Sequence, residues 1–385
     1  MLSWRLNDTG PEMRRDLDPA TGRPVVVRET FGGAFLFAFH YNLHYMPAWL
    51  AEYIVCIAAL AMLLSIVSGV ITHKRIFKDY FTLRLNKSQR SWLDAHNAMA
   101  VLALPFQLMI TYTGLVTLIF LIMPWGVMTG YSHTEAFRRD FRPRAPSAQF
   151  HQKDALRLSA AELVAAARRS DGAMPRSLYT HEDYASNGVI EVWPNLEKLG
   201  ASYETRFLQS DGEVIPPATG PGAATNSMGV MVDLHAGRFS GYVLRWLYFV
   251  SGLAGTAMIA TGLILWVRKR RESAGLRPSA TGLWIAERLN VGIIAGSMAG
   301  IGACFLANRL LPVPLPGRAE KEVACLFFAW AAVILWSLLR EPKQGWIVSL
   351  AFGALLFAMV PLVNAVTTAR GLIPSLAGRD WVFAS

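Results

Sequence analysis

The chain has 385 residues, of which 53% are hydrophobic and only 17% are charged. Because a soluble domain carries about 25% charged residues, this composition indicates a membrane protein. The formal net charge is +10, but the excess falls mainly in short loops beside apolar segments. Positive charge in such loops orients a membrane protein, so the pattern argues against nucleic acid as a partner. The three cysteines lie inside apolar segments and no Cys-x-x-Cys-His is present, which argues against a disulfide framework and covalently attached haem.

The N-terminal 47 residues are expected to form a polar tail followed by an interfacial helix. Residues 1–30 show no signal-peptide pattern, since no charged start leads into an apolar core. The segment from Phe31 to Trp49 is aromatic but too short and too polar to cross a bilayer. Its His40 and His44 are four residues apart, and a helix would place both on one face.

Six apolar segments have about the 20 residues that a membrane-spanning helix needs, or nearly so. They are Ala48–Thr72, Ala98–Met123, Trp246–Val267, Leu289–Ala307, Val323–Leu339 and Trp346–Ala369. The predicted fold class is therefore mainly α, a polytopic membrane helix bundle with a small α+β domain inserted between spans two and three. The expected divisions are 1–47 for the tail and interfacial helix, 48–123 for the first two spans, 124–245 for the insertion and 246–385 for four further spans.

The lysines and arginines of the short loops predict how these spans are oriented. Residues 73–97 and 268–288 each contain six of them, whereas 308–322 contain three and 370–385 contain two. The first two loops are therefore expected in the cytoplasm, and the N-terminus and the insertion outside.

Within the insertion, the sequence predicts a helix followed by a small antiparallel sheet. The expected elements are a helix at 159–169, a strand at 188–193, a hairpin around 210–212 and a linker at 216–222. The helix opens with Ser159 and Glu162, the spacing of a capping box.

Pairs of small residues recur in the spans. They are Ser68-Gly69, Thr113-Gly114, Ser251-Gly252 and Thr261-Gly262. Since small residues let membrane helices approach closely, we expect these pairs to serve helix packing.

The histidines gather at the predicted membrane boundaries. His73 and His96 bracket the first cytoplasmic loop, while His40, His44 and His235 stand at the outer ends of the first and third spans. Ionisable residues at membrane depth are costly and usually functional, and imidazole is the usual axial ligand of haem iron. The pattern favours two haem sites, one held by His73 and His96 and the other by His235 with His44, for which His40 is the competitor.

Two such sites would lie roughly 30–40 Å apart along the first span and form a route for electrons across the membrane. Zinc is disfavoured because it needs three or four convergent ligands and neither H-E-x-x-H nor C-x-x-C is present. Asp94 and Asp233 each precede a histidine by two residues, so each is a candidate acceptor that orients a ring. For Lys74, Arg75 and Arg238, topology and anionic lipid are the default interpretation, and haem propionates are the alternative.

The residues around these histidines resemble the PepSY-associated transmembrane proteins of bacterial inner membranes, a group linked to iron and siderophore uptake. The motifs that carry the resemblance are F-H-Y-N-L-H at 39–44, G-V-I-T-H-K-R-I-F-K-D-Y-F-T-L-R at 69–84, R-S-W-L-D-A-H-N at 90–97, L-P-F-Q-L-M-I-T-Y-T-G-L at 104–115, D-L-H-A-G-R at 233–238 and T-G-L-I-L-W-V-R-K-R-R at 261–271. The match covers about 31–271, and residues 272–385 are less diagnostic.

The resemblance implies a ferric-siderophore reductase of the inner membrane with a PepSY-like periplasmic domain. By the same resemblance, His44, His73, His96 and His235 are the axial ligands of two b-type haems. Electrons would pass from an unidentified donor on the cytoplasmic side, or in the membrane pool, to a periplasmic ferric hydroxamate such as ferrioxamine. Two alternatives stay open: a non-redox siderophore permease or regulatory protein with a periplasmic ligand-binding domain, and a quinone-linked cytochrome b.

Overall fold

The structure is a computed structural model. It describes residues 2–4, 13–16, 23–24, 27–72, 89–133, 136–137, 141, 158–171, 175–179, 189–194, 198–200, 206–209, 211–215, 222–274, 281–368 and 371–379. The chain divides into two compact units, Met1–Tyr41 with Gly262–Ser385, and Asn42–Thr261. Among the described residues six helices are long and apolar enough to cross a membrane, so this is a multi-pass membrane protein.

All six predicted spans are present, but most of the helices extend beyond the apolar segments. The helices are α2 (Ala48–Thr72), α4 (Gln89–Thr117), α11 (Tyr242–Ala274), α12 (Thr281–Leu310), α13 (Arg318–Leu339) and α14 (Pro342–Thr367). The second span differs most, since α4 begins nine residues before Ala98 and gives way after Thr117 to the short helices α5 (Ile119–Ile122) and α6 (Trp125–Gly130). Hydropathy marks where a helix is apolar, whereas charged residues with good helix propensity continue it into the interface.

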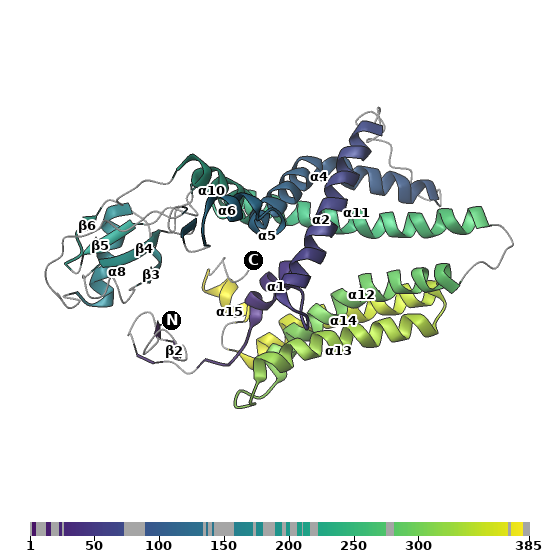
Figure 1. Cartoon of the computed structure of the whole chain (residues 1–385). Helices are drawn as coiled ribbons and strands as arrows, with labels where there is room; N and C mark the ends of the chain where they lie inside the picture. Colours follow the sequence, from purple (N-terminus) through teal and green to yellow (C-terminus); the bar gives the residue numbers. More distant parts are fainter. Residues whose placement is uncertain are drawn as a thin grey trace. The chain divides into compact units, whose positions relative to one another are not determined.

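In the first unit, α12 packs closely against α13 and α14, and Figure 1 shows these three helices side by side in green to yellow. Three glycines of α12 face α13. A Cβ added to Gly292, Gly296 or Gly300 would come within 2.9 Å or less of an α13 atom. Ala295 and Ala299, between them, are fully buried. Small residues therefore let the backbones of α12 and α13 approach closely, which is the role that the sequence predicts for small residues in the spans.

The N-terminal segment belongs to this same unit. It contributes the helix α1 (Gly32–Asn42), whose Phe35 and Phe39 pack against Val323 and Leu326 of α13. It also contributes a two-stranded antiparallel sheet of β1 (Leu2–Trp4) and β2 (Met13–Arg15), where the sequence predicts only a polar tail. A short helix, α15 (Leu372–Ala377), follows the last span.

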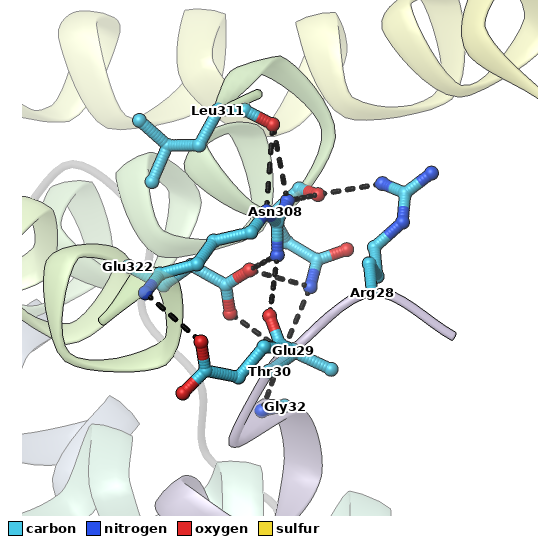
Figure 2. Close-up of polar contacts among 8 residues, drawn as sticks. Arg28, Glu29, Thr30, Gly32, Asn308, Leu311 and Glu322 are labelled. Carbon is cyan, nitrogen blue, oxygen red and sulfur yellow. Dashed lines mark hydrogen bonds and ion pairs between the residues drawn. The ribbon is translucent and has the colours of Figure 1, made fainter. Parts of the chain in front are cut away.

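A buried polar cluster fixes the N-terminal segment between α12 and α13 (Figure 2). Arg318 and Glu322, both fully buried, form an ion pair one helical turn apart on α13. The Arg318 guanidinium also donates to the backbone carbonyls of Glu29 (2.8 Å) and Asn308 (2.6 Å), and the Thr30 hydroxyl donates to Glu322 at 2.6 Å. A buried ion pair is tolerated when its remaining donors and acceptors are satisfied in this way.

In the second unit, α4 and α11 form an antiparallel pair. The Phe106 and Tyr248 rings lie 5.6 Å apart edge to face, and the Gln107 amide donates to the Ser251 carbonyl at 2.6 Å. Gly255 makes room for Gln107, since a Cβ there would lie 2.2 Å from the amide nitrogen. As the contacts move toward the start of α4 they move toward the end of α11, which defines the register of the pair.

The insertion of the second unit is a helix packed on a four-stranded antiparallel sheet, which confirms the predicted helix and small antiparallel sheet but adds one strand. Its elements are α8 (Ala160–Asp171), β3 (Pro175–Tyr179), β4 (Val189–Pro194), β5 (Arg206–Gln209) and β6 (Val214–Ile215), and the strands pair in that order. The core joins Leu163 and Ala166 of the helix to Ile190, Val192 and Leu208 of the sheet. The capping box is confirmed, because the Ser159 amide donates to Glu162 at 2.7 Å and the Glu162 amide donates back at 3.3 Å. The edge strand β3 is absent from the prediction.

The segment after the sheet contains a helix that the sequence analysis does not predict. α10 (Ala223–Ala236) follows the linker and ends at Gly237, which adopts a left-handed conformation (φ 62°). Its Asp233 carboxylate is buried and accepts the Gly200 amide at 2.8 Å. The Thr225 hydroxyl donates to the Phe141 carbonyl at 2.9 Å. These bonds tie α10 to the insertion.

Candidate functional site

His96 lies on α4 with its ring against α11. Its Nδ1 is 3.0 Å from the Met258 carbonyl oxygen and 3.1 Å from the Thr261 hydroxyl. A carbonyl oxygen can only accept, so the bond to Met258 requires the proton on Nδ1, and in the neutral ring the lone pair is then on Nε2. The sequence places His96 just before a helix, whereas α4 already begins at Gln89, so the ring lies in the third turn. Its neighbours on α11 hold it there.

His235 is held in the same way at another level of α4. It lies in the last turn of α10, and its Nδ1 is 2.9 Å from the Ile110 carbonyl oxygen and 3.4 Å from the Thr113 hydroxyl. This carbonyl also requires the proton on Nδ1. The ring lies against Gly114, where an added Cβ would be 2.8 Å from ring atom Cε1. The sequence places His235 at the outer end of the third span, but it belongs to α10 and contacts the second span.

The two rings mark two levels along one helix. Fourteen residues separate His96 from Ile110, and eighteen separate it from Gly114. At 1.5 Å per residue, the two levels stand roughly 21–27 Å apart along the axis of α4. Each level presents an imidazole whose tautomer is set by a neighbouring helix, which is how proteins orient histidines that bind a metal through Nε2.

The other candidate ligands have different surroundings. His73 lies outside the described residues. His44 follows α1 in a turn where Leu43 and Tyr45 have positive φ (43° and 60°), and its ring centroid is 4.2 Å from that of Tyr45. Because α1 ends at Asn42, the expectation that His40 and His44 share one helical face is wrong. His40 belongs to the first unit, and His44 belongs to the second together with His96 and His235.

Helix geometry excludes the ring-orienting roles considered for the two aspartates. Asp94 lies two residues before His96 within α4, and Asp233 lies two residues before His235 within α10. Side chains two residues apart on a helix do not face each other. The Met258 and Ile110 carbonyls take the Nδ1 protons, and Asp233 accepts the Gly200 amide.

The small-residue pairs include a signal that the sequence analysis misses. Thr113-Gly114 contacts the His235 ring, and Thr261 contacts the His96 ring. At these positions the small residues make room for a histidine ring from a neighbouring helix. At Gly69 and Gly252, an added Cβ would meet no atom of the described residues within 4 Å, so the packing interpretation gains no support at those two positions. A small-residue pair therefore points to the candidate site only where it lies opposite a histidine of a neighbouring helix. Which pairs lie opposite a histidine follows only from the fold.

Within the described ranges, no three histidine, cysteine, aspartate or glutamate side chains converge to hold a metal ion. A haem iron needs only two axial ligands from the protein, because the porphyrin supplies the other four. The chemistry of an imidazole held through Nδ1 fits such a ligand.

Comparison with known proteins adds two findings. The family described as the PepSY-associated TM region matches residues 5–269, which include every candidate histidine. The chain is also similar to PA4219, an uncharacterized protein of Pseudomonas aeruginosa. The two are 25% identical over 350 residues, which cover 84% of this chain and 85% of that protein.

Proposed function

Because this chain belongs to the PepSY-associated transmembrane family, we propose that it is a haem-dependent ferric-siderophore reductase of the bacterial inner membrane. Two b-type haems would be held by His73 with His96 on the cytoplasmic side and by His44 with His235 on the periplasmic side. We choose His44 over His40 because it belongs to the same compact unit as His235.

One observation carries the proposal: His96 and His235 are oriented by the same kind of hydrogen bond at two levels of α4. Each Nδ1 donates to a backbone carbonyl of a neighbouring helix, at 3.0 Å and 2.9 Å, so in the neutral ring each lone pair is on Nε2. Hydrogen bonding at Nδ1 also raises the basicity of a ligating imidazole and fixes its ring plane.

The reaction is a one-electron reduction of the substrate. When bound, the two haems would supply one-electron centres near opposite faces of the membrane. A donor on the cytoplasmic side or in the membrane pool loses one electron for each Fe(III) that becomes Fe(II) outside. Hydroxamate oxygens are hard ligands that suit Fe(III) better than Fe(II), so reduction releases the iron.

The chain's own residues position the ligands and pack the helices between them. Met258 and Thr261 orient His96, and Ile110 orients His235. Between the two levels, α4 and α11 contact each other through Phe106, Tyr248 and Gln107. The insertion, anchored to α10 through Asp233, is the proposed periplasmic domain, next to the outer site.

The test is a visible spectrum of the purified protein, oxidised and then reduced with dithionite. We expect low-spin bands from two haems per chain. His96→Ala should remove the haem of one site and His235→Ala that of the other. His133→Ala is the matched control, because His133 is exposed and bonds its neighbour Ser132, so it should keep both haems. A colourless protein from haem-replete cells would instead favour the permease or regulatory alternative.

A further inference from the structure

A small cavity is lined by residues that follow His235 in the chain, and two of these residues are arginines. It is about 380 Å³ in volume and is lined by Ala236, Gly237, Arg238, Ser240, Arg245 and Tyr248. These residues are the last residue of α10, the turn between α10 and α11, and the first two turns of α11. Two arginines thus line one cavity, within one unit of the protein.

The walls of this cavity are held by hydrogen bonds to the backbone on both sides of His235. The Tyr248 hydroxyl donates to the Leu234 carbonyl at 2.7 Å, and the Gly237 amide donates to the Asp233 carbonyl at 2.8 Å. The Ser240 hydroxyl, which is buried, donates to the Gly237 carbonyl. The Arg245 Nε donates to the Ser240 carbonyl at 2.8 Å, which sets the plane of its guanidinium. The cavity is therefore a built feature of the same turn that ends the histidine helix.

Charge and size together define what this cavity would bind. Guanidinium groups bind carboxylates and phosphates through paired donors, so two of them favour an oxyanion. Pockets for whole small molecules run from about 300 to 1,000 Å³, so this one is at the lower limit. It suits the charged end of a ligand whose body lies elsewhere. Arginines outside the membrane are also not needed for orientation, which depends on cytoplasmic positive charge.

We propose that this cavity, formed by Arg238, Arg245 and the turn that follows His235, binds the propionate carboxylates of the haem that His235 ligates. The inference rests on the proposed function, and it names the charged contact of the outer site. Two sources offer an oxyanion here, the haem and the headgroup of an anionic lipid. The haem is favoured because the cavity begins at the residue next to His235 and shares its hydrogen-bonded turn.

The expected consequence is a higher reduction potential of the outer haem. Two cations beside the carboxylates offset negative charge near the iron and so favour the added electron. With Arg238→Gln or Arg245→Gln, we expect both haems to stay bound and the reduction potential of one of them to fall. The expected size is a tenfold drop in the reduction equilibrium constant per arginine, which is 59 mV for a one-electron couple. Arg238→Lys should restore part of the potential, because it keeps the charge but loses the paired donors.

The experiment is a spectroscopic redox titration of the full chain in neutral detergent, with haem content measured on the same samples. Arg340→Gln is the matched control, because Arg340 lies in the other unit, over the Trp336 ring at 4.5 Å, and both potentials should stay unchanged. A second arm replaces haem with its dimethyl ester, which has no free carboxylates. In that arm the arginine variants should match the wild type.

Each contrary outcome has a separate meaning. Two haems with unchanged potentials in both glutamine variants would overturn the inference and leave the proposed function standing. A shift that appears only in vesicles containing anionic lipid, and not in neutral detergent, would overturn it in favour of a lipid phosphate. A wild type that binds no haem would overturn the inference and the proposed function together.

Discussion

The substitution Gly114→Ala tests whether the ring of His235 must lie where the structure has it. An alanine Cβ at this position would stand 2.8 Å from Cε1 and 3.3 Å from Nδ1 of His235, whereas ordinary van der Waals contacts begin at 3.4 Å. The ring must therefore move about 0.6 Å away from α4. Because Ile110 lies on the same helix, the same movement stretches the 2.9 Å bond from Nδ1 toward the limit of hydrogen bonding.

The energetic cost should appear in haem binding more than in folding. Overpacking typically costs about 1–3 kcal/mol, and the weakened hydrogen bond adds about 1 kcal/mol. Alanine is favoured over glycine in a helix by roughly 0.8–1 kcal/mol, so part of the loss in folding stability is offset. No such gain offsets the displaced ligand. A loss of about 1–3 kcal/mol at the iron corresponds to roughly 5- to 150-fold weaker haem binding.

The assay compares haem content and the reduced-minus-oxidised spectrum of Gly114→Ala with those of Gly252→Ala. Gly252 is the matched control, since it also lies in a membrane helix but an added Cβ there has no neighbour within 4 Å among the residues that the structure describes. Its alanine variant should keep two haems. If Gly114→Ala binds the outer haem as tightly as the wild type, with the same spectrum, then His235 is not its ligand in the observed conformation.

Three further outcomes follow from single contacts. Thr261→Val removes the 3.1 Å contact to His96 but leaves the Met258 carbonyl, so the inner haem should dissociate about tenfold faster, as measured by transfer to a haem acceptor. Asp233→Asn weakens a charged acceptor to a neutral one, so the insertion should become more sensitive to protease while the membrane helices stay protected. The Ser159 hydrogen bonds hold the pKa of Glu162 below its ordinary value of 4.5, so α8 should be stabilised above pH 4.5 and should lose this stabilisation as the pH falls through the lowered pKa. Hydrogen exchange in α8 should show that dependence in the wild type and not in the Ser159→Ala variant.

The number and order of the spans follow from the sequence because bilayer thickness imposes a length on every apolar helix. The first span, Ala48–Thr72, has the bounds that were predicted. The start of α4 was missed by nine residues, because Gln89 to Asn97 is polar and yet helical. Hydropathy indicates whether a segment lies in lipid or in water, and it indicates only indirectly whether the backbone of that segment is helical.

The insertion was predictable in part because some of its elements are specified by local sequence signals. The capping box at Ser159 and the turn at Gly212, where φ is 86°, are local signals that set their own geometry. The strand β3 begins at Pro175 and lies at the sheet edge, so it needs neither full alternation nor every backbone donor. Helix α10 has the most consequence for the site, because it carries His235 away from the third span to a position against the second.

The pairing of distant segments was beyond the reach of any local pattern. The sequence marks His96 and His235 as candidates but contains no local signal that Met258 and Ile110 supply their acceptors. Likewise, no pattern near residue 30 predicts that Thr30 donates to Glu322 across the first unit. These contacts depend on which helices meet and in which register.

Gln107 offers a physical account of that register in the second unit. Lipid tails are as apolar as leucine, so burial of apolar side chains does not select one alignment of α4 and α11 over another. A buried amide does select one, because its donor must find a carbonyl, and Gln107 finds that of Ser251 at 2.6 Å over the space left by Gly255. A slip of one turn would move the pair by about 5.4 Å. The His96 ring would then lose Met258, so the polar contact in the middle of the pair also decides whether the carbonyl that accepts the His96 Nδ1 proton lies within reach.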